Sequence, residues 1–266
     1  LERRIIWKQT ILSGNFQNGI KKLLDENIIN PSDASRKVEG LIFEASTDPA
    51  ITGLTVDAQF TGDNLYDAIK KLCDSKNIGF RIKLSDDNKF VFKLYAGADR
   101  SYDQFTNPYV IFSPKFENVI NTNYLESKKT LKTVTLVAGE GEGADRRTTT
   151  VACASGAGTG LNRRELYTDA RDVSSTVDNE TLTDTEYNAQ LSQRGLENLA
   201  ENIATKSFEG KVESTRMYRY GEDFFLGDMV QIVNEYGIEG KARVTEFIRS
   251  QSKEGLDSYP TFVTVE

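Results

Sequence analysis

Residues 218–262 read YRYGEDFFLGDMVQIVNEYGIEGKARVTEFIRSQSKEGLDSYPTF, and this stretch decides the fold. Runs rich in Val, Ile and aromatic residues alternate here with glycines, a pattern typical of short strands joined by turns. The pattern predicts four strands, near Val212–Tyr220, Met229–Asn234, Lys241–Ser250 and Pro260–Val265. Their regular spacing favours a β-barrel or a meander.

The triplet Leu226-Gly227-Asp228 lies directly before one of these strands. Gly227 permits a tight turn, and the Asp228 carboxylate is expected to accept hydrogen bonds from nearby amides before the strand starts to pair. We interpret this motif as a barrel corner, which needs no substrate.

The first part of the chain has a different pattern. Apolar residues at helical spacing predict one helix from Phe16 to Ile28 and another from about Asn64 to Asn77. The alternating runs GFRIKL (79–84) and FVFKLY (90–95) flank a polar stretch of hairpin length. Residues 1–110 are therefore predicted to form a small α+β domain.

The second part, residues 111–266, is predicted to be a β-barrel domain that carries one long helix. Residues 128–138 have the composition of a strand, and a glycine-rich link follows. Thr183 and Glu186 have the spacing of a capping box, which predicts a helix over about 183–206. The expected fold class is α+β, with a tail-tube-like barrel beside the smaller domain.

The composition argues against several functions. There are 33 basic and 40 acidic residues, and a net charge of −7 disfavours DNA binding through phosphate neutralisation. The absence of histidine removes the commonest general base and metal ligand. No apolar run approaches the length needed to cross a bilayer.

Two further features bear on the state of the chain. Cys73 and Cys153 lie eighty positions apart and are interpreted as buried free thiols, because they form no metal-site or disulfide pattern. The sequence begins with Leu1, and we expect it to be a fragment of a longer protein.

Two glycine-rich segments are candidate phosphate sites. Gly139–Gly143 carries two glutamates and is followed by strand-forming residues, so it is interpreted as a mobile hairpin tip that becomes ordered only on assembly. Ser155–Gly160 lacks the Lys-Ser/Thr ending of a P-loop and is interpreted as a flexible loop.

Acidic residues supply the remaining candidates for chemistry. A glycosidase needs two carboxyl groups across a cleft, and the first candidates are Glu140, Glu142, Asp145 and Glu165. Oxygen-rich loops can bind calcium, and the candidates are Asp169, Asp172, Asp178 and Glu180, with Asp86, Asp87 and Asn88 as a second group. We interpret all of them as solvated loop residues and predict no catalytic, cofactor-binding or metal-binding residues.

Two further features could lie on the surface. The glycosylation sequon Asn179-Glu180-Thr181 is interpreted as incidental. Aromatic residues are frequent near the C-terminus, and we favour a role in the barrel core over a carbohydrate or partner surface. They are Tyr218, Tyr220, Phe224, Phe225, Tyr236, Phe247, Tyr259 and Phe262.

The order of these motifs resembles a family of siphophage and prophage tail proteins encoded near the tail tip. The resemblance rests on the stretch quoted first and on three upstream segments, FENVINTNYLES (116–127), VTLVAGEGEGADR (134–146) and GLNRRELYTDARDVSS (160–175). Residues 5–37 fit the same pattern. The family is similar to baseplate hub proteins and to the N-terminal regions of tail-associated lysins.

The resemblance implies a structural subunit of the tail tip or baseplate hub, not an enzyme. It implies assembly into a ring, commonly a trimer, between the tail tube and the distal tail components. The expected partners are other tail proteins, with no nucleic acid, membrane, cofactor or small-molecule substrate. The expected location is the virion, after assembly in the host cytoplasm. The alternatives are a cell-wall or polysaccharide hydrolase and a carbohydrate-binding module for host attachment.

Overall fold

The computed structural model describes residues 1–177, 180–212, 217–237, 239–253 and 255–265. The chain groups into two compact units, each built from two segments. The first unit consists of residues 1–95 and 131–203, and the second of residues 96–130 and 204–266. This grouping differs from the expected division at residue 110, because the long helix and the strands before it belong to the first unit.

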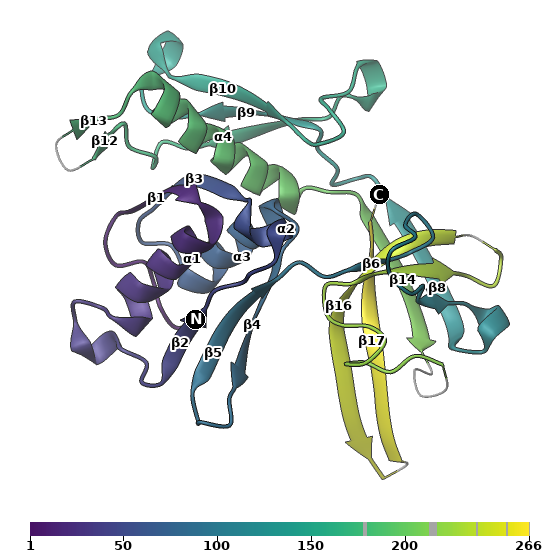
Figure 1. Ribbon diagram of the computed structural model, residues 1–266. Helices are drawn as coiled ribbons and strands as arrows, with labels where there is room; N and C mark the ends of the chain where they lie inside the picture. The colour runs from purple at the N-terminus through teal and green to yellow at the C-terminus, as the bar shows by residue number, and fades with distance from the viewer. Residues whose placement is uncertain (178–179, 213–216, 238, 254, 266) are drawn as a thin grey trace. The chain divides into compact units, whose positions relative to one another are not determined.

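The first unit mixes helices with small sheets (Figure 1). Its first segment contains β1 (Thr10–Asn15), α1 (Phe16–Leu24), β2 (Leu41–Glu44), α2 (Pro49–Thr52), β3 (Thr55–Phe60), α3 (Leu65–Ser75), β4 (Gly79–Leu84) and β5 (Phe90–Tyr95). Its second segment contains β9 (Val134–Ala138), β10 (Thr148–Ala152), β11 (Glu165–Asp169), β12 (Thr176–Val177), β13 (Glu180–Thr181) and α4 (Asp184–Glu201). The sheets have the orders β1-β3, β2-β5-β4, β10-β9-β11 and β12-β13.

The two early helices follow the predicted spacing. Phe16, Ile20, Leu23 and Leu24 are buried in α1, and a π-helical turn over Asp25–Ile29 buries Ile28. The Asn64 side chain caps α3 by accepting from the amide of Tyr66 at 2.9 Å. Both predicted helices are therefore confirmed.

The predicted hairpin is confirmed as β4 and β5, which pair antiparallel from Gly79 with Tyr95 to Leu84 with Phe90. Asn88 takes the left-handed conformation that the turn requires, with φ of +56°. β2 adds to β5 in parallel, and Phe80 and Phe92 stack at 5.4 Å between ring centroids.

The long helix α4 begins as predicted and ends earlier. Thr183 and Glu186 form the capping box, with the Thr183 amide donating to the Glu186 carboxylate at 2.9 Å. The helix ends at Glu201, five residues before the expected end, because residues 205–212 form a strand instead. Tyr187 and Leu191 pack with Val137 in the core of this part of the unit.

The second unit is built around one mixed sheet of seven strands. They are β6 (Asp99–Arg100), β7 (Ile111–Phe112), β8 (Val119–Ser127), β14 (Thr205–Val212), β15 (Met229–Val233), β16 (Glu239–Ser252) and β17 (Gly255–Val265). The order is β6-β15-β16-β17-β14-β8, and β7 also pairs with β15. Across the described ranges, no pairing joins β8 to β6 or β7, so the sheet is open there.

Three of the four strands predicted from the C-terminal stretch are present as β15, β16 and β17. The fourth, near Val212–Tyr220, lies partly outside the described residues, and in the described part only Val212 belongs to a strand. The strand is β14, Thr205–Val212, which pairs antiparallel with β8. Residues 213–216 lie outside the described part, and Tyr220 makes only an isolated bridge to Phe224.

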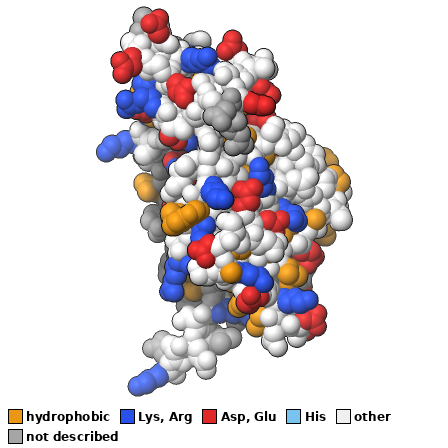
Figure 2. Space-filling model, turned by 90° about the vertical axis from the view of Figure 1, so that its left-hand side faces the viewer, with side chains coloured by type: hydrophobic (Ala, Val, Ile, Leu, Met, Phe, Trp, Pro, Cys, Tyr) orange, Lys and Arg blue, Asp and Glu red, His pale blue; other side chains and the backbone are white. Residues whose placement is uncertain are grey.

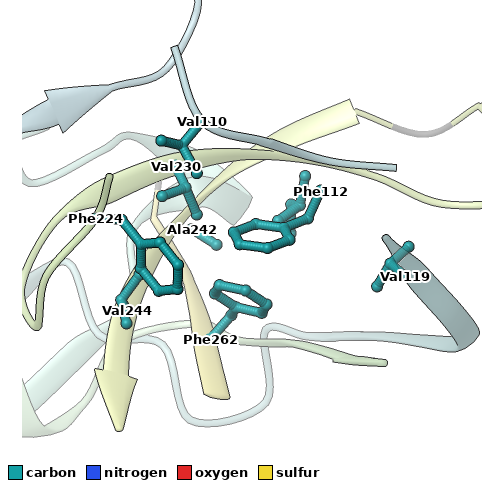
Figure 3. Close-up of a cluster of buried hydrophobic side chains, with 9 residues drawn as sticks. Val110, Phe112, Val119, Phe224, Val230, Ala242, Val244 and Phe262 are labelled. Carbon is teal, nitrogen blue, oxygen red and sulfur yellow. The ribbon is translucent and has the colours of Figure 1, made fainter. Parts of the chain in front are cut away.

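An aromatic core fills the curved sheet (Figure 3). Phe112 lies at its centre, with ring centroids 5.0 Å from Phe262 and 5.6 Å from Phe224. Val110 and Val119 also point into this cluster, although they lie next to β7 and on β8, at opposite ends of the strand order. The two ends of the sheet therefore share one core.

The C-terminal aromatic residues mostly serve this core, as favoured from the sequence. Phe224 and Phe262 are buried, and four others pack against the cluster, namely Tyr218, Tyr220, Phe247 and Tyr259. Phe225 and Tyr236 are exposed instead. The molecule is thus a mixed α+β protein, mostly sheet with few helices. No helix of the described chain is both long and apolar enough to span a membrane.

Candidate functional site

The Asp228 carboxylate organises the edge of the seven-stranded sheet. Its side chain is buried, and Oδ1 accepts from the amide of Ala98 at 2.7 Å. Oδ2 accepts from Arg100 Nε at 2.7 Å and from the amide of Phe225 at 3.0 Å. The predicted role of Asp228 as an acceptor for amides before the strand is confirmed, and the ion pair with Arg100 adds a contact that the local sequence did not show.

Two glycines allow the backbone to come this close. Gly227 has φ of +89° and Gly97 has φ of +76°, conformations that other residues rarely adopt. A Cβ atom on Gly97 would lie 2.1 Å from the carbonyl oxygen of Gly227. Arg243 donates to the same oxygen at 3.0 Å. This arrangement fixes β6 on β15 and therefore fixes the base of the loop that follows β6.

The surroundings of the four hydrolase candidates do not favour a catalytic pair of carboxyl groups. Partial desolvation opposes ionisation of Glu140, but hydrogen bonds from Ser175 outweigh it and hold the pKa of Glu140 below its ordinary value. A general acid in a glycosidase needs a raised pKa. Glu165 is paired with Arg163 at 2.7 Å, and Glu142 and Asp145 lie in the turn between β9 and β10.

That turn, residues 139–147, is held by specific contacts. The Gly139 amide donates to the carbonyl of Arg147 at 2.9 Å. The Arg146 guanidinium donates to the carbonyl of Gly139 at 2.9 Å and to that of Ala138 at 2.8 Å. That this tip becomes ordered only on assembly stays a prediction.

The calcium candidates are largely neutralised by arginines. Hydrogen bonds from Arg171 and Arg146 hold the pKa of Asp169 well below its usual range. Asp172 pairs with Arg194 at 2.9 Å. Asp178 and Asn179 lie outside the described residues, so their candidate roles stay predictions.

The other candidate loops are also local turns. Asp86 and Asp87 lie in the β4–β5 turn. Ser155–Gly160 leads into a single 3₁₀ turn and then β11, without the helix that a P-loop requires. Within the described ranges, His, Cys, Asp and Glu side chains form no cluster of three or more that is suited to a metal ion.

The two cysteines are free thiols with different surroundings. Cys73 is buried on α3, and burial raises the pKa of its thiol well above the usual range, as expected for a packing residue. Cys153 is half-buried, so the prediction that both thiols are buried is wrong for Cys153.

A buried polar seam on α4 was missed by the sequence reasoning. Gln190, Gln193 and Glu197 are each at most 5% exposed, and Gln193 Nε2 donates to Glu197 Oε1 at 3.2 Å. Burial raises the pKa of Glu197 to about 7, although Arg194 at 3.8 Å opposes the rise. The spacing i, i+3 and i+7 places the three residues on one face of the helix. This spacing is the feature of the sequence from which the seam could have been predicted.

The charged surface is mixed. On the face drawn in Figure 2, Lys and Arg side chains lie among Asp and Glu side chains, and hydrophobic side chains form small separate groups. This face therefore does not present the continuous basic patch that phosphate binding favours.

Comparisons with known proteins point in one direction. The family model described as "Siphovirus ReqiPepy6 Gp37-like protein" matches residues 1–262. A comparison with curated protein sequences found no match.

Three solved structures of tail proteins align with nearly the whole chain. Prophage tail protein gp18 from Listeria monocytogenes EGD-e has a TM-score of 0.50 at 14% identity, covering 100% of this chain and 69% of that one. The 43 kDa tail protein of prophage MuSo2 from Shewanella oneidensis has a TM-score of 0.49 at 10% identity, with coverages of 97% and 67%. The tail protein from Neisseria meningitidis MC58 has a TM-score of 0.47 at 13% identity, with coverages of 98% and 70%. At 14% identity, the similarity to the Listeria protein is a similarity of fold.

Proposed function

The chain belongs to the family of Siphovirus ReqiPepy6 Gp37-like proteins and is a structural protein of the phage tail, and from that premise we propose that it works by ring assembly at the tail tip. The ring, a trimer of this chain, lies between the tail tube and the distal tail components. Its partners are other tail proteins, and the chain assembles in the host cytoplasm before it becomes part of the virion. The family match over 1–262 is the observation that carries this proposal.

The core of the second unit supports a tail-tube-like barrel in the assembled state. Its sheet is open in the described chain, yet Phe112 on β7 and Val119 on β8 point into the same core. An open sheet leaves unpaired backbone donors and acceptors at both edges, and a neighbouring strand can satisfy them. We propose that neighbouring subunits complete the barrel at these edges.

The β16–β17 hairpin supplies a second assembly element. Among the described residues of the hairpin, β15 pairs with 239–243 of β16, and β14 pairs with 262–263 of β17. Beyond these points, residues 246–252 and 255–261 pair only with each other in the described chain. A two-stranded ribbon is marginally stable on its own, so contact with another subunit would stabilise it.

The division into two domains stays a prediction. We propose that the domain boundaries follow the two compact units, 1–95 with 131–203 and 96–130 with 204–266, instead of residue 110. In this division the second unit forms the barrel.

We also propose that the chain has no enzymatic activity. Hydrogen bonds from Ser175 hold the pKa of Glu140 below its ordinary value, which does not suit a general acid, and Glu165 is paired with Arg163. A cell-wall zymogram of the purified chain is expected to show no clearing. Clearing that is lost in the Glu140→Gln or Glu142→Gln variant would replace this proposal with a hydrolase.

Deletion of the gene from its phage or prophage tests the assembly role. We expect electron micrographs of the deletion lysate to show heads and incomplete tails, and complementation with the full chain to restore complete tails. Normal infectious tails in the deletion would contradict the proposal.

A further inference from the structure

Residues 101–110 are looped out of an otherwise continuous edge strand. Met229 and Val230 of β15 pair with Asp99 and Arg100, and the next two residues of β15 pair with Ile111 and Phe112. Four consecutive residues of β15 are therefore paired without a gap, although their partners are separated in the sequence by the ten residues 101–110. The Val110 amide donates to the carbonyl of Arg100 at 3.0 Å and closes the base of the loop. Loops of this kind, with ends close together, are frequently functional.

One glutamine holds the loop in a fixed shape. Gln104 Oε1 accepts from the amides of Thr106 and Asn107 at 2.7 and 2.6 Å. Its Nε2 donates to the carbonyls of Ser101 and Asn107 at 3.2 and 3.0 Å. Asn107 Nδ2 in turn donates to the carbonyl of Asp99 at 2.9 Å. The loop is thus preorganised, which lowers the entropy cost of binding.

The loop exposes a phenylalanine side chain. Phe105 follows Gln104 directly and is 93% exposed. Tyr102 and Tyr109 flank it near the base, 42% and 39% exposed, with ring centroids 5.7 Å apart. Single exposed apolar residues are common on protein surfaces, but a rigid loop that carries three exposed aromatic residues has the composition of a binding hot spot.

The surroundings of the loop are acidic. Asp103 pairs with Lys241 at 2.8 Å, and this bond, with a further contribution from Asp99, raises the pKa of the Lys241 ammonium. Burial raises the pKa of the Tyr102 phenol, and the nearby Glu239 carboxylate adds to the rise. Three carboxylates, those of Asp99, Asp103 and Glu239, therefore lie around the base of the loop, and two of them interact with the Lys241 ammonium. Such a surface repels anionic lipid headgroups and suits a partner with basic side chains.

We propose that the loop 101–110 is a docking knob that inserts Phe105 into an apolar pocket, rimmed by Lys or Arg, on a different tail protein. The proposal rests on the assembly function proposed above. A second copy of this chain is a poorer electrostatic match, because the chain carries a net charge of −7. The aromatic apex supplies most of the affinity, and the acidic base sets the orientation.

Site-specific photocross-linking tests the partner. The full chain with Phe105→p-benzoylphenylalanine is supplied in trans to the deletion phage, and the assembled tails are irradiated and digested for mass spectrometry. We expect a cross-link to a different tail protein, at a site lined by apolar residues and flanked by Lys or Arg. A cross-link to a second copy of this chain, to glycan or lipid, or to nothing would overturn the proposal.

Binding of the full chain to the cross-linked protein then tests the energetics. Phe105→Ala is expected to weaken the affinity about 30-fold or more, as loss of a hot-spot residue does. Leu161→Ala is the matched control, because Leu161 is 98% exposed on a loop of the first unit, and it should change the affinity by less than about twofold. Equal affinities for the two variants would overturn the proposal.

The same phage separates this inference from the assembly function. If the deletion abolishes tails while Phe105→Ala restores them fully, the chain is an assembly protein and the docking knob is wrong. If the deletion leaves tails intact, the assembly function itself fails.

Discussion

Asp228 and Glu197 are both buried carboxylates, each 2% exposed, but they have different partners. The Asp228 carboxylate accepts hydrogen bonds from two backbone amides and from the Arg100 guanidinium. Glu197 meets an amide and a more distant guanidinium, and burial raises its pKa. The motif around Asp228 could be recognised because its contacts begin with neighbours in the sequence, whereas Arg100 lies 128 residues away.

Replacing Asp228 with Asn is expected to destabilise the second unit by about 3 kcal/mol. The variant leaves the half-buried Arg100 charge without its partner, and breaking a buried ion pair costs about 3–5 kcal/mol. Hydrogen exchange followed by mass spectrometry, on peptides that cover residues 98–101 and 225–230, measures the loss locally.

Glu222→Gln is the control for this variant. Its ion pair with Arg219 is exposed on both sides, so the change should stay below about 0.5 kcal/mol. Similar exchange in the two variants would mean that the Asp228 contacts do not hold the sheet edge.

Glu197 gives the first unit a pH dependence with a definite sign. Its folded pKa of about 7 lies above the unfolded value of about 4.3, so the fold favours the protonated form. The contribution to stability is fully present below pH ~4.3 and is lost as the pH rises through ~7. Glu197→Gln should therefore exceed the parent in stability at pH 8, by ~1–3 kcal/mol, and match it within ~1 kcal/mol at pH 5.

Urea unfolding followed by the fluorescence of Trp7, the single tryptophan and a residue of the first unit, measures this difference. Asp172, Lys71 and Asp63 also lie near the Arg194–Glu197 pair, and all three are kept in the variant. A variant that is less stable than the parent at pH 8 would show that the ionised carboxylate is stabilising.

At the scale of elements, the helices and strands that depend on local sequence patterns could be predicted. The capping box of α4, the apolar spacing of α1 and α3, and the alternation of β4 and β5 all depend on residues close in the chain. The end of α4 was predicted too late because the residues after it pair with β8, some eighty positions upstream. Pairing across that distance competes with helix propensity, and it leaves no local signal.

Gly195 shows the same competition within α4. Glycine has a lower helix propensity than alanine and is disfavoured inside a helix. A Cβ atom at position 195, however, would lie 2.8 Å from Val137 Cγ2 and 2.9 Å from Val151 Cγ2. The glycine thus lets α4 approach β9 and β10 closely.

Gly195→Val should destabilise the first unit by about 2 kcal/mol, because overpacking a well-filled core costs about 1–3 kcal/mol. Asn188→Val, on the exposed face of the same helix, should cost less than about 0.5 kcal/mol. Thermal unfolding of both variants checks the difference, and a Gly195→Val variant as stable as Asn188→Val would contradict the close contact.

At the scale of the whole molecule, the discontinuous units could not be predicted. Each unit takes two separate segments, and the crossing points near residues 95, 130 and 203 are set by pairings between distant strands. The candidate site was predictable only in part for the same reason. The sequence singled out Gly227 and Asp228, but it gave no sign that residues 101–110 interrupt the partner of β15. The family resemblance, which rests on the order of motifs along the chain, was confirmed by the match over 1–262.

Cryo-electron microscopy of tails from the parent phage is the most direct test of the assembly role. We expect this chain to form a ring of three copies at the end of the tail tube, with strands of neighbouring second units side by side and the β16–β17 ribbon in contact with another subunit. Tails that lack the chain, or that carry it as an isolated peripheral copy, would contradict the account.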